Sequence, residues 1–313
     1  MINGITNFKY PITVLPPKNS RIISKYNLEK DTVSFSGKME LTPVAEEALS
    51  IQSKLHKLYR SNNLSIQTIQ EVFNSKSPVP VEIKPISQIP NALKYKDCLA
   101  YMQPCYENDL SMKKAIIYLN DNFSDKRNAS NIIADCIHEY THVLQRHKDG
   151  DYLRLSKVTN NLEEARFLNF IGAQAMGDTE KSLFNILNSN VQYTNLINKK
   201  FKTNTPVTKN DIKPYLPSKE ELDKSLNNLL DIRFKKLTEK LSIPQQDLGE
   251  YEDFYNKAKP TLKESVIRQF EMEAEAKSAD IEARKRGLVF DSRTIFAHSI
   301  NKSLYEAYLE IMK

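Results

Sequence analysis

The sequence predicts an α+β fold, with a small sheet and one buried helix in the first half and a mostly α-helical second half. Short runs rich in β-branched and aromatic residues lie before residue 120, which is typical of strands. After residue 150 the apolar residues follow helical spacing, and strand-like alternation is almost absent. The regular structure therefore divides into regions 41–150 and 151–313, and a polar, aperiodic segment over 1–40 precedes them.

The first 40 residues are expected to form a flexible basic tail. They hold six basic and three acidic side chains, which is half of the chain's net charge of +6. Such a composition is typical of a solvated segment, and only a short strand near 32–36 is expected in it. This pattern disfavours nucleic acid as a partner, because no zinc-finger spacing and no aromatic–basic sheet signature accompany the charge.

Two helices are expected before the strands. Thr42 is a good N-cap and Pro43 suits the first helical position, and the apolar spacing that follows predicts one helix over 42–59. A second helix is expected over 65–73.

In the second half, glycine and proline predict helix breaks near 177, 203–206, 214–217 and 244.

Three strands are expected next. Residues 79–83 are interpreted as an edge strand, because Pro80 cannot donate a hydrogen bond to a central ladder. Residues 99–106 are a second candidate, and 115–119 (AIIYL) have the strongest strand pattern. A helix with a broad apolar surface is then predicted over about 129–146, so this helix should be largely buried.

Composition excludes several classes of protein. A chain of 313 residues can bury a sizeable core without staples. Three cysteines make no disulfide framework, and the first 20 residues lack a secretory signal, so a cytoplasmic protein is expected. The sequence contains no run of 18 or more apolar residues, so no transmembrane helix is expected. The chain has only seven glycines and no Gly-rich phosphate-binding motif, which disfavours folds that bind phosphate through a Gly-rich loop.

The helix over 129–146 contains His138-Glu139-Tyr140-Thr141-His142, an H-E-x-x-H pattern. Positions i and i+4 share one helical face, so two imidazoles there can bind one tetrahedral Zn²⁺. Glu139 lies about 100° round the helix, beside the metal. Its carboxylate can take a proton from water whose pKa the zinc lowers, and pass that proton to a leaving amine.

This motif, preceded by the strand at 115–119, resembles the zincin metallopeptidases over residues 79–150 and one later helix. The resemblance implies an edge strand that binds an extended peptide by strand addition, zinc ligands at His138 and His142, and Glu139 as the general base. Metzincins have glycine and histidine where this chain has Gln145 and Lys148. The resemblance is therefore to the gluzincins, in which a glutamate on a later helix is the third ligand.

Two glutamates of the helical region are candidates for that third ligand. Glu271 is favoured, because its E-x-x-A context resembles the gluzincin element, and small residues at 274 and 278 allow close helix approach. The alternative for this segment is a solvated charged helix, since Glu273, Glu275 and Lys277 crowd it. The second candidate is Glu164, 22 residues after His142, a spacing similar to that of thermolysin. Glu164 is otherwise interpreted as an acidic first turn that stabilises a helix dipole.

Other potential ligands are assigned structural roles. His147 is out of phase with the motif and is expected at the surface. His298 is expected to be a helix residue with a local partner, with oxyanion stabilisation as the alternative. Cys136 should pack as a small apolar residue. For Cys98 and Cys105 the alternative to a structural role is that one of them supplies a thiolate that binds the zinc and blocks it.

These patterns lead to one main functional hypothesis. The chain is expected to be a zinc-dependent metallopeptidase of gluzincin type that hydrolyses peptide or protein substrates. One alternative is a non-catalytic protein that keeps a zincin-like fold as a binding scaffold, which the intact Glu139 disfavours. Another is a helical protein that binds nucleic acid or an anionic surface through its basic tail, with salt-dependent affinity.

Overall fold

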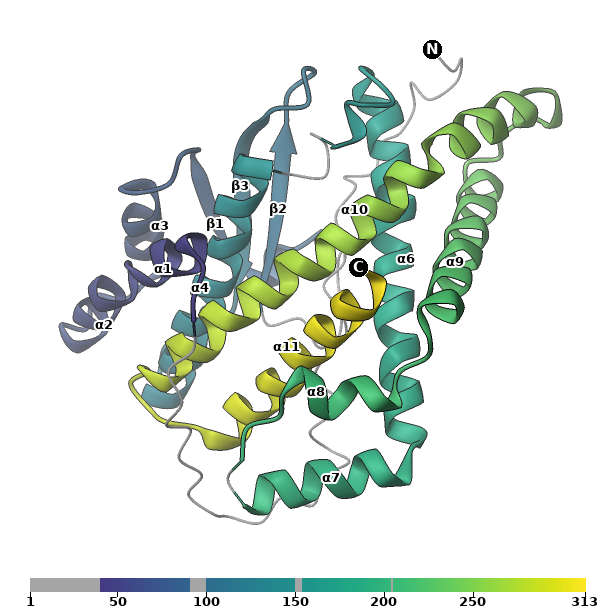
Figure 1. Ribbon diagram of the computed structural model, residues 1–313. Coiled ribbons are helices and arrows are strands. Elements are labelled where there is room, and N and C mark those ends of the chain that lie inside the picture. The colour runs from purple at the N-terminus through teal and green to yellow at the C-terminus, as the bar shows by residue number, and fades with distance from the viewer. Residues whose placement is uncertain (1–39, 91–99, 150–153, 204) are drawn as a thin grey trace.

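The computed structural model describes residues 40–90, 100–149, 154–203 and 205–313. Within these residues the fold is α+β, as predicted, with one three-stranded sheet and long helices (Figure 1). Residues 1–39 of the tail expected over 1–40, its strand near 32–36 and Cys98 lie outside the described residues. The strands are β1 (Val81–Pro85), β2 (Ala100–Tyr106) and β3 (Met112–Leu119). The helices before the sheet are α1 (Pro43–Leu49), α2 (Gln52–Arg60) and α3 (Ile66–Asn74), and η4 (Ile86–Gln88) follows β1.

The second group of helices starts after β3. These are α4 (Lys126–Asp149), α6 (Leu162–Ser189), α7 (Val191–Lys202), α8 (Lys209–Ile212), η6 (Lys213–Tyr215), α9 (Lys219–Lys240), α10 (Gln245–Lys285) and α11 (Ser292–Met312). None of the helices in the described part of the chain combines the length and the apolar character that crossing a membrane requires.

The sheet has the order β1-β3-β2, so the most apolar strand lies in the centre. β1 runs parallel to β3, with Val81 opposite Ala115, and β2 runs antiparallel to β3, with Ala100 opposite Leu119. The edge position predicted for the Pro80 segment is confirmed, although the strand begins at Val81. In this arrangement the proline carbonyl still accepts a hydrogen bond of 3.0 Å from the amide of Ala115.

Alternation along the strands gives the sheet two unequal faces. One face packs on α4 and α3 in an apolar cluster that includes Ile117, Ile133 and Ile137. The other face carries a small cluster in which the rings of Tyr101 and Tyr118 stack with centroids 6.4 Å apart. The two faces differ because the side chains of a strand point alternately to opposite sides of the sheet. Helix α4 packs on the face with the larger cluster and is therefore largely buried, as expected.

The first helical segment differs from its prediction. Thr42 is the N-cap, and its hydroxyl accepts a hydrogen bond of 3.2 Å from the amide of Ala45. The single helix expected over 42–59 is interrupted by a turn at Ser50 and Ile51, so it forms α1 and α2. The apolar periodicity continues through the turn, because Ile51 and Leu55 are both fully buried.

The breaks predicted in the helical half are mostly confirmed. α7 ends at Lys202, the short helix η6 (Lys213–Tyr215) ends before α9 begins at Lys219, and α10 starts directly after Pro244. The break expected at Gly177 is wrong, because α6 continues through this residue to Ser189. A glycine inside a helix costs only about 1 kcal/mol relative to alanine, and the buried neighbours Met176 and Leu183 stabilise the helix across it.

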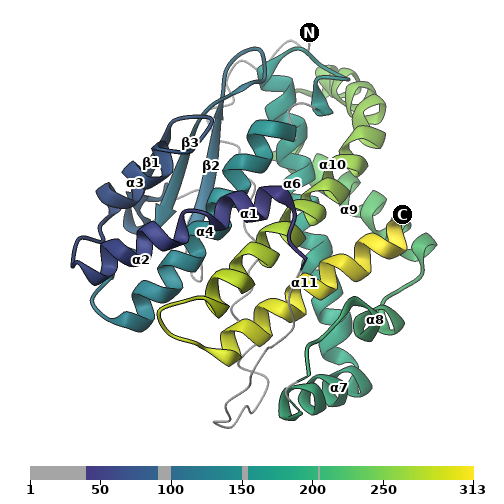
Figure 2. The ribbon, with the colours of Figure 1, turned by 60° about the vertical axis from the view of Figure 1, so that its left-hand side comes forward.

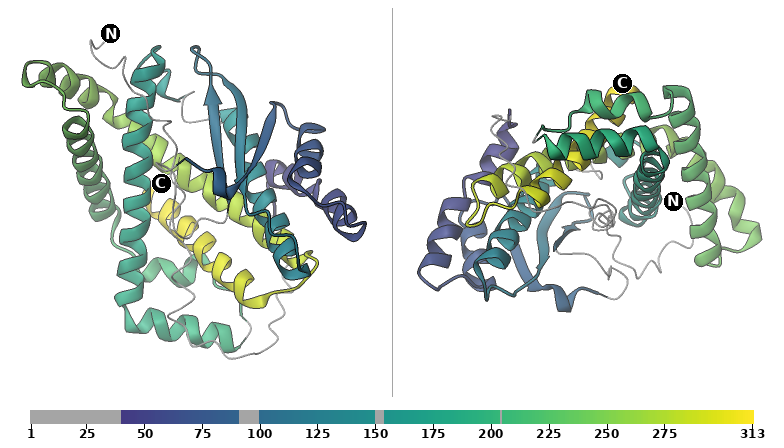
Figure 3. Two further views of the ribbon diagram at one scale, coloured as in Figure 1. Left: turned by 180° about the vertical axis from the view of Figure 1, so that it is seen from behind. Right: turned by 90° about the horizontal axis from the view of Figure 1, so that it is seen from below.

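Helix α10 connects the two apolar clusters of the molecule. Val266 and Phe270 belong to the cluster of the helical half. Ala279 and Ala283, further along the same helix, belong to the cluster of the sheet and α4. In Figure 1 this helix crosses in front of α6 and the strands, and Figure 3 shows it behind them from the opposite side. The second region of the sequence thereby places side chains directly on α4.

The N-terminal helices lie over the same junction. Figure 2 shows α1 running across α4 and α10, both of which it contacts. The side-chain amide of Gln52 donates a hydrogen bond of 2.7 Å to the carbonyl of Ala283 on α10. Three segments that are distant in sequence therefore meet around the H-E-x-x-H helix.

Candidate metal centre

Helix α4 is longer than its predicted range and starts at Lys126. The side chain of Asp125 satisfies the first turn by accepting hydrogen bonds of 2.9 Å from the amides of Arg127 and Asn128. Ile137 and Tyr140 face the sheet cluster, and the Tyr140 ring stacks on Phe73 at 4.7 Å. The apolar face thus orients the helix, and the histidine face is turned to α10.

Helices α4 and α10 run antiparallel to each other. Near the start of α4, Asn131 accepts a hydrogen bond of 2.9 Å from Arg284, which is near the end of α10. Near the end of α4, Gln145 donates a hydrogen bond of 3.0 Å to the carbonyl of Met272, which comes earlier in α10. Between these two contacts lies the space in which the histidines of α4 meet α10.

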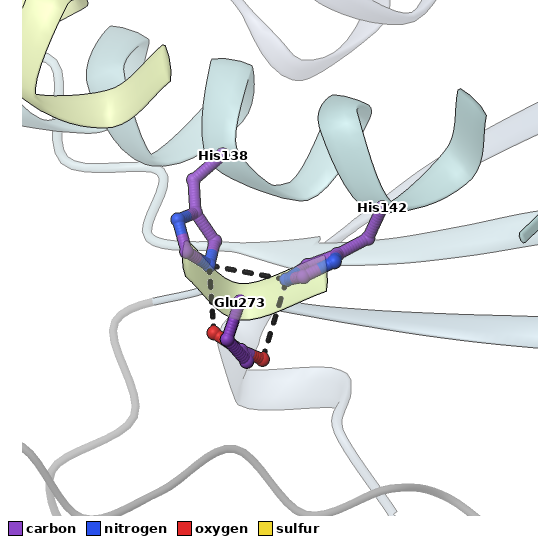
Figure 4. Close-up of side chains that lie close together, drawn as sticks. All are labelled: His138, His142 and Glu273. Carbon is purple, nitrogen blue, oxygen red and sulfur yellow. Dashed lines mark hydrogen bonds and ion pairs between the residues drawn. The ribbon is translucent and has the colours of Figure 1, made fainter. Parts of the chain in front are cut away.

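Three side chains converge in that space (Figure 4). The Nε2 atoms of His138 and His142 are 3.2 Å apart. The carboxylate of Glu273 places Oε1 3.4 Å from Nε2 of His142 and Oε2 3.7 Å from Nε2 of His138. Nitrogen and oxygen ligands at about 2.0–2.2 Å from a tetrahedral ion are about 3.3 Å apart. One ring nitrogen of each histidine and one carboxylate oxygen of Glu273 all lie within 4.8 Å of one another, so these three side chains could hold one metal ion.

The third member of this cluster is Glu273, and the structure does not bring Glu271, the expected third ligand, to the histidines. Residues two apart on a helix point about 200° from each other, because each residue turns the helix by about 100°. Glu271 lies away from the histidines, with its carboxylate 2.9 Å from Arg268 and 3.4 Å from Lys313. The packing of Phe270 and Ala274 in the helical cluster turns Glu273 toward α4.

The second candidate, Glu164, also lies elsewhere. It is in the first turn of α6, and its carboxylate accepts a hydrogen bond from the hydroxyl of Thr159. The side chain of Asn161 caps this turn by accepting from the amides of Glu163 and Glu164 at 2.8 and 3.1 Å. The alternative interpretation of Glu164, as an acidic first turn, agrees with this placement.

Burial and charge set the protonation of the cluster. Burial, together with Lys277 and His142, holds the pKa of His138 well below 6.5. Burial opposes ionisation of Glu273, but the two histidines outweigh it and lower the pKa of this carboxyl to about 2. Burial would also lower the pKa of His142, yet the carboxylate of Glu273 raises it. The cluster thus offers a carboxylate and imidazole nitrogens, which suit a divalent cation.

Glu139 lies next to the first histidine and is 7% exposed. Burial, the largest effect, and the negative charges of Glu273 and Asp135 raise the pKa of its carboxyl to about 7. A carboxylate with a pKa near neutrality both accepts and returns protons at physiological pH. The residue that the motif assigns to proton transfer therefore has a suitable environment for it.

A ladder of buried charges continues along the same helix pair. Arg284 contacts Asp280 at 2.8 Å and Asp135 at 2.5 Å, and all three side chains are at most 14% exposed. Lys277 lies 3.8 Å from Asp280. Glu273 belongs to this stripe, because positions 273, 277, 280 and 284 repeat at helical spacing. That polar periodicity, rather than the E-x-x-A pattern, was the sequence signal for Glu273.

The remaining predictions for individual residues have mixed outcomes. His147 is exposed and Cys136 is fully buried, as predicted. His298 has the expected local partner, because its Nδ1 atom contacts the carboxylate of Asp280 on α10. Cys105 is half-buried in β2 and is not part of the metal-ligating cluster among the described residues.

Comparisons with known proteins add no further constraint. No family model, no curated protein and no solved structure matches the chain. The functional argument therefore rests on the geometry of the cluster and the chemistry of its side chains. Three side chains from two helices could hold a metal ion, and Glu139 lies next to one of them. Catalytic zinc sites typically combine three protein ligands with an open fourth position.

Proposed function

We propose that this chain is a zinc-dependent metallopeptidase of the gluzincin type, with zinc held by His138, His142 and Glu273 and with Glu139 as the general base. The observation that supports it most strongly is the convergence of the Glu273 carboxylate with the two imidazoles, since one ligand atom from each side chain lies within 4.8 Å of the others. This carboxylate comes from a separate helix, so the local spacing of the H-E-x-x-H motif does not account for its position.

The proposed chemistry divides between the ion and the protein. A bound zinc lowers the pKa of water and polarises a carbonyl oxygen. Glu139 takes the proton of the attacking water, and its raised pKa of about 7 suits it to pass this proton to the leaving amine. Glu273 and the histidines orient the ion and take no proton in this scheme.

The sheet supports a peptide as the substrate. β2 is an edge strand that, in the described sheet, pairs only with β3. It also packs against α4, the helix that carries the histidines. An extended peptide that adds to an edge strand gains backbone hydrogen bonds, and its alternate side chains remain available for pockets. Strand addition at β2 would hold a peptide bond beside α4.

Two measurements test this proposal. Elemental analysis should find about one zinc per chain in the native protein and none in the His142→Ala variant. The Glu139→Gln variant should retain zinc but lose peptide hydrolysis by about 10²–10⁴-fold, the usual contribution of a general base. A zinc-free native protein after reconstitution with zinc contradicts the proposal. A zinc-loaded native protein that hydrolyses peptides no faster than the Glu139→Gln variant, at background level, supports a non-catalytic scaffold instead.

A further inference from the structure

Gln145 lies one helical turn after His142 and is 2% exposed. Its side-chain Oε1 is 2.8 Å from Nδ1 of His142. Its side-chain Nε2 donates hydrogen bonds to the carbonyl of Met272 at 3.0 Å and to Oε2 of Glu275 at 2.6 Å. This amide therefore connects a histidine of α4 with two groups of α10, the helix that carries Glu273.

These contacts determine which way the amide points. A backbone carbonyl and a carboxylate accept hydrogen bonds and do not donate them, so the NH₂ group of Gln145 must face Met272 and Glu275. The amide oxygen is then directed to His142. Because this oxygen only accepts, Nδ1 of His142 must carry the hydrogen. The lone pair of the neutral imidazole is consequently on Nε2, the atom that faces His138 and Glu273.

We propose that Gln145 is a positioning residue that holds His142 in the Nδ1–H tautomer and directs the Nε2 lone pair to the metal. Glu275 and Met272 lock the amide, so α10 supplies both the third ligand and the support of the second. The lock extends to the N-terminal helices, since the hydroxyl of Thr42 donates to the other oxygen of Glu275.

The two histidines differ in this support. Nδ1 of His138 is buried and has no hydrogen-bond partner in the described part of the chain. Partners on the second ring nitrogen fix the tautomer and the ring orientation of metal-binding histidines, and their loss typically costs 10- to 100-fold in metal affinity. The protein therefore positions His142 tightly through Gln145, and His138 lacks an equivalent partner among these residues.

Histidine ¹⁵N NMR on the metal-free, full-length protein, recorded at a pH high enough for the His142 imidazole to be neutral, tests the tautomer directly. We expect His142 to show a protonated Nδ1 in the native protein and to lose this fixed form in Gln145→Met, which has similar length but no amide. Gln145→Glu should keep the Nδ1–H form, because a carboxylate still accepts the hydrogen bond. The matched control is Gln67→Met, since Gln67 is exposed and its side-chain amide donates to the carboxylate of Glu71 at 3.4 Å. It should leave the His142 signal unchanged.

Zinc affinity, measured by competition with a chelator, is the second measurement. This part rests on the proposed metal site. Gln145→Met should weaken zinc binding about 10- to 100-fold, and Gln67→Met should not. Glu275→Ala, which removes one half of the lock, should weaken binding by a smaller factor and keeps the test available if Gln145→Met does not fold.

Two outcomes overturn the inference. One is an Nε2–H tautomer of His142 in the native protein. The other is a folded Gln145→Met variant with the native tautomer and native zinc affinity. Failure of the native protein to bind zinc contradicts the proposed function, but the NMR measurement on the metal-free protein still decides the role of Gln145.

Discussion

Oε1 of Glu273 on α10 lies 3.4 Å from Nε2 of His142 on α4. These residues belong to the two regions into which the sequence divides, and each helix is packed in a different apolar cluster over part of its length. The contact therefore depends on how the helical half docks on the sheet region. A metal bound there would cross-link the two regions, which makes both metal binding and stability sensitive to the same residues.

The assignment of the third ligand predicts different behaviour for neighbouring glutamates. Glu273→Gln should weaken zinc binding by at least about 100-fold, because loss of a ligand exceeds the effect of losing an outer partner. Glu271→Gln and Glu164→Gln should bind zinc like the native protein, since their carboxylates contact Arg268 and Thr159 instead. Isothermal titration with zinc measures all three. Weakened binding in Glu271→Gln with unchanged binding in Glu273→Gln would contradict the geometry.

Zinc should stabilise the folded protein. A ligand that binds only the folded state adds about 2.7 kcal/mol to the free energy of unfolding when it is present at 100 times its Kd. Urea unfolding of the native protein with zinc and with a chelator measures this difference. The same comparison in Glu273→Gln is the control, and we expect the difference to disappear. An equal zinc effect in both proteins would mean that the ion binds elsewhere.

The buried charge ladder should contribute strongly to stability through its arginine. Arg284→Met removes the guanidinium that pairs with the buried carboxylates of Asp280 and Asp135, and breaking a buried pair typically costs about 3–5 kcal/mol. Arg286→Met is the matched control, because Arg286 is 58% exposed and an exposed pair contributes about 0–1 kcal/mol. Urea unfolding of the two variants compares the losses. Similar small losses would show that Asp280 and Asp135 do not depend on Arg284.

The buried imidazole of His298 predicts a loss of stability in acid. Burial lowers its pKa to about 4 in the folded protein, although Asp280 opposes this effect and Lys277 and Arg284 add to it. The unfolded chain, with a histidine pKa of 6.5, then binds more protons than the folded chain between these values. The free energy of unfolding should therefore fall as the pH falls from about 6.5 to about 4, by up to about 3 kcal/mol for this group.

The His298→Gln variant isolates that contribution. Asp135 has the opposite effect, because burial raises its carboxyl pKa to about 6, so the native curve alone mixes two trends. The difference in unfolding free energy between the native protein and His298→Gln should depend on pH between 4 and 6.5 and become constant above this range. A difference that stays constant across the whole range would mean that His298 titrates normally in the folded protein.

Local sequence patterns correctly predicted the strands and helix starts that are determined by residues close in the sequence. Strand composition located β3 and the edge strand at Pro80, and the N-cap signal located the start of α1 at Thr42. Predictions of helix ends were less accurate. The turn at Ser50 and the continuity of α6 through Gly177 depend on burial against other elements, which outweighs intrinsic propensity.

The sequence by itself determined three of the four residues of the candidate site. The i, i+4 spacing places His138 and His142 on one helical face, and adjacency places Glu139 beside them, whatever the rest of the chain does. The third ligand has no such local constraint. Glu271 and Glu273 lie about 200° apart on α10, so only the rotation of this helix about its axis selects between them. Phe270 in one cluster and Ala279 in the other set that rotation, and these contacts exist only in the tertiary structure.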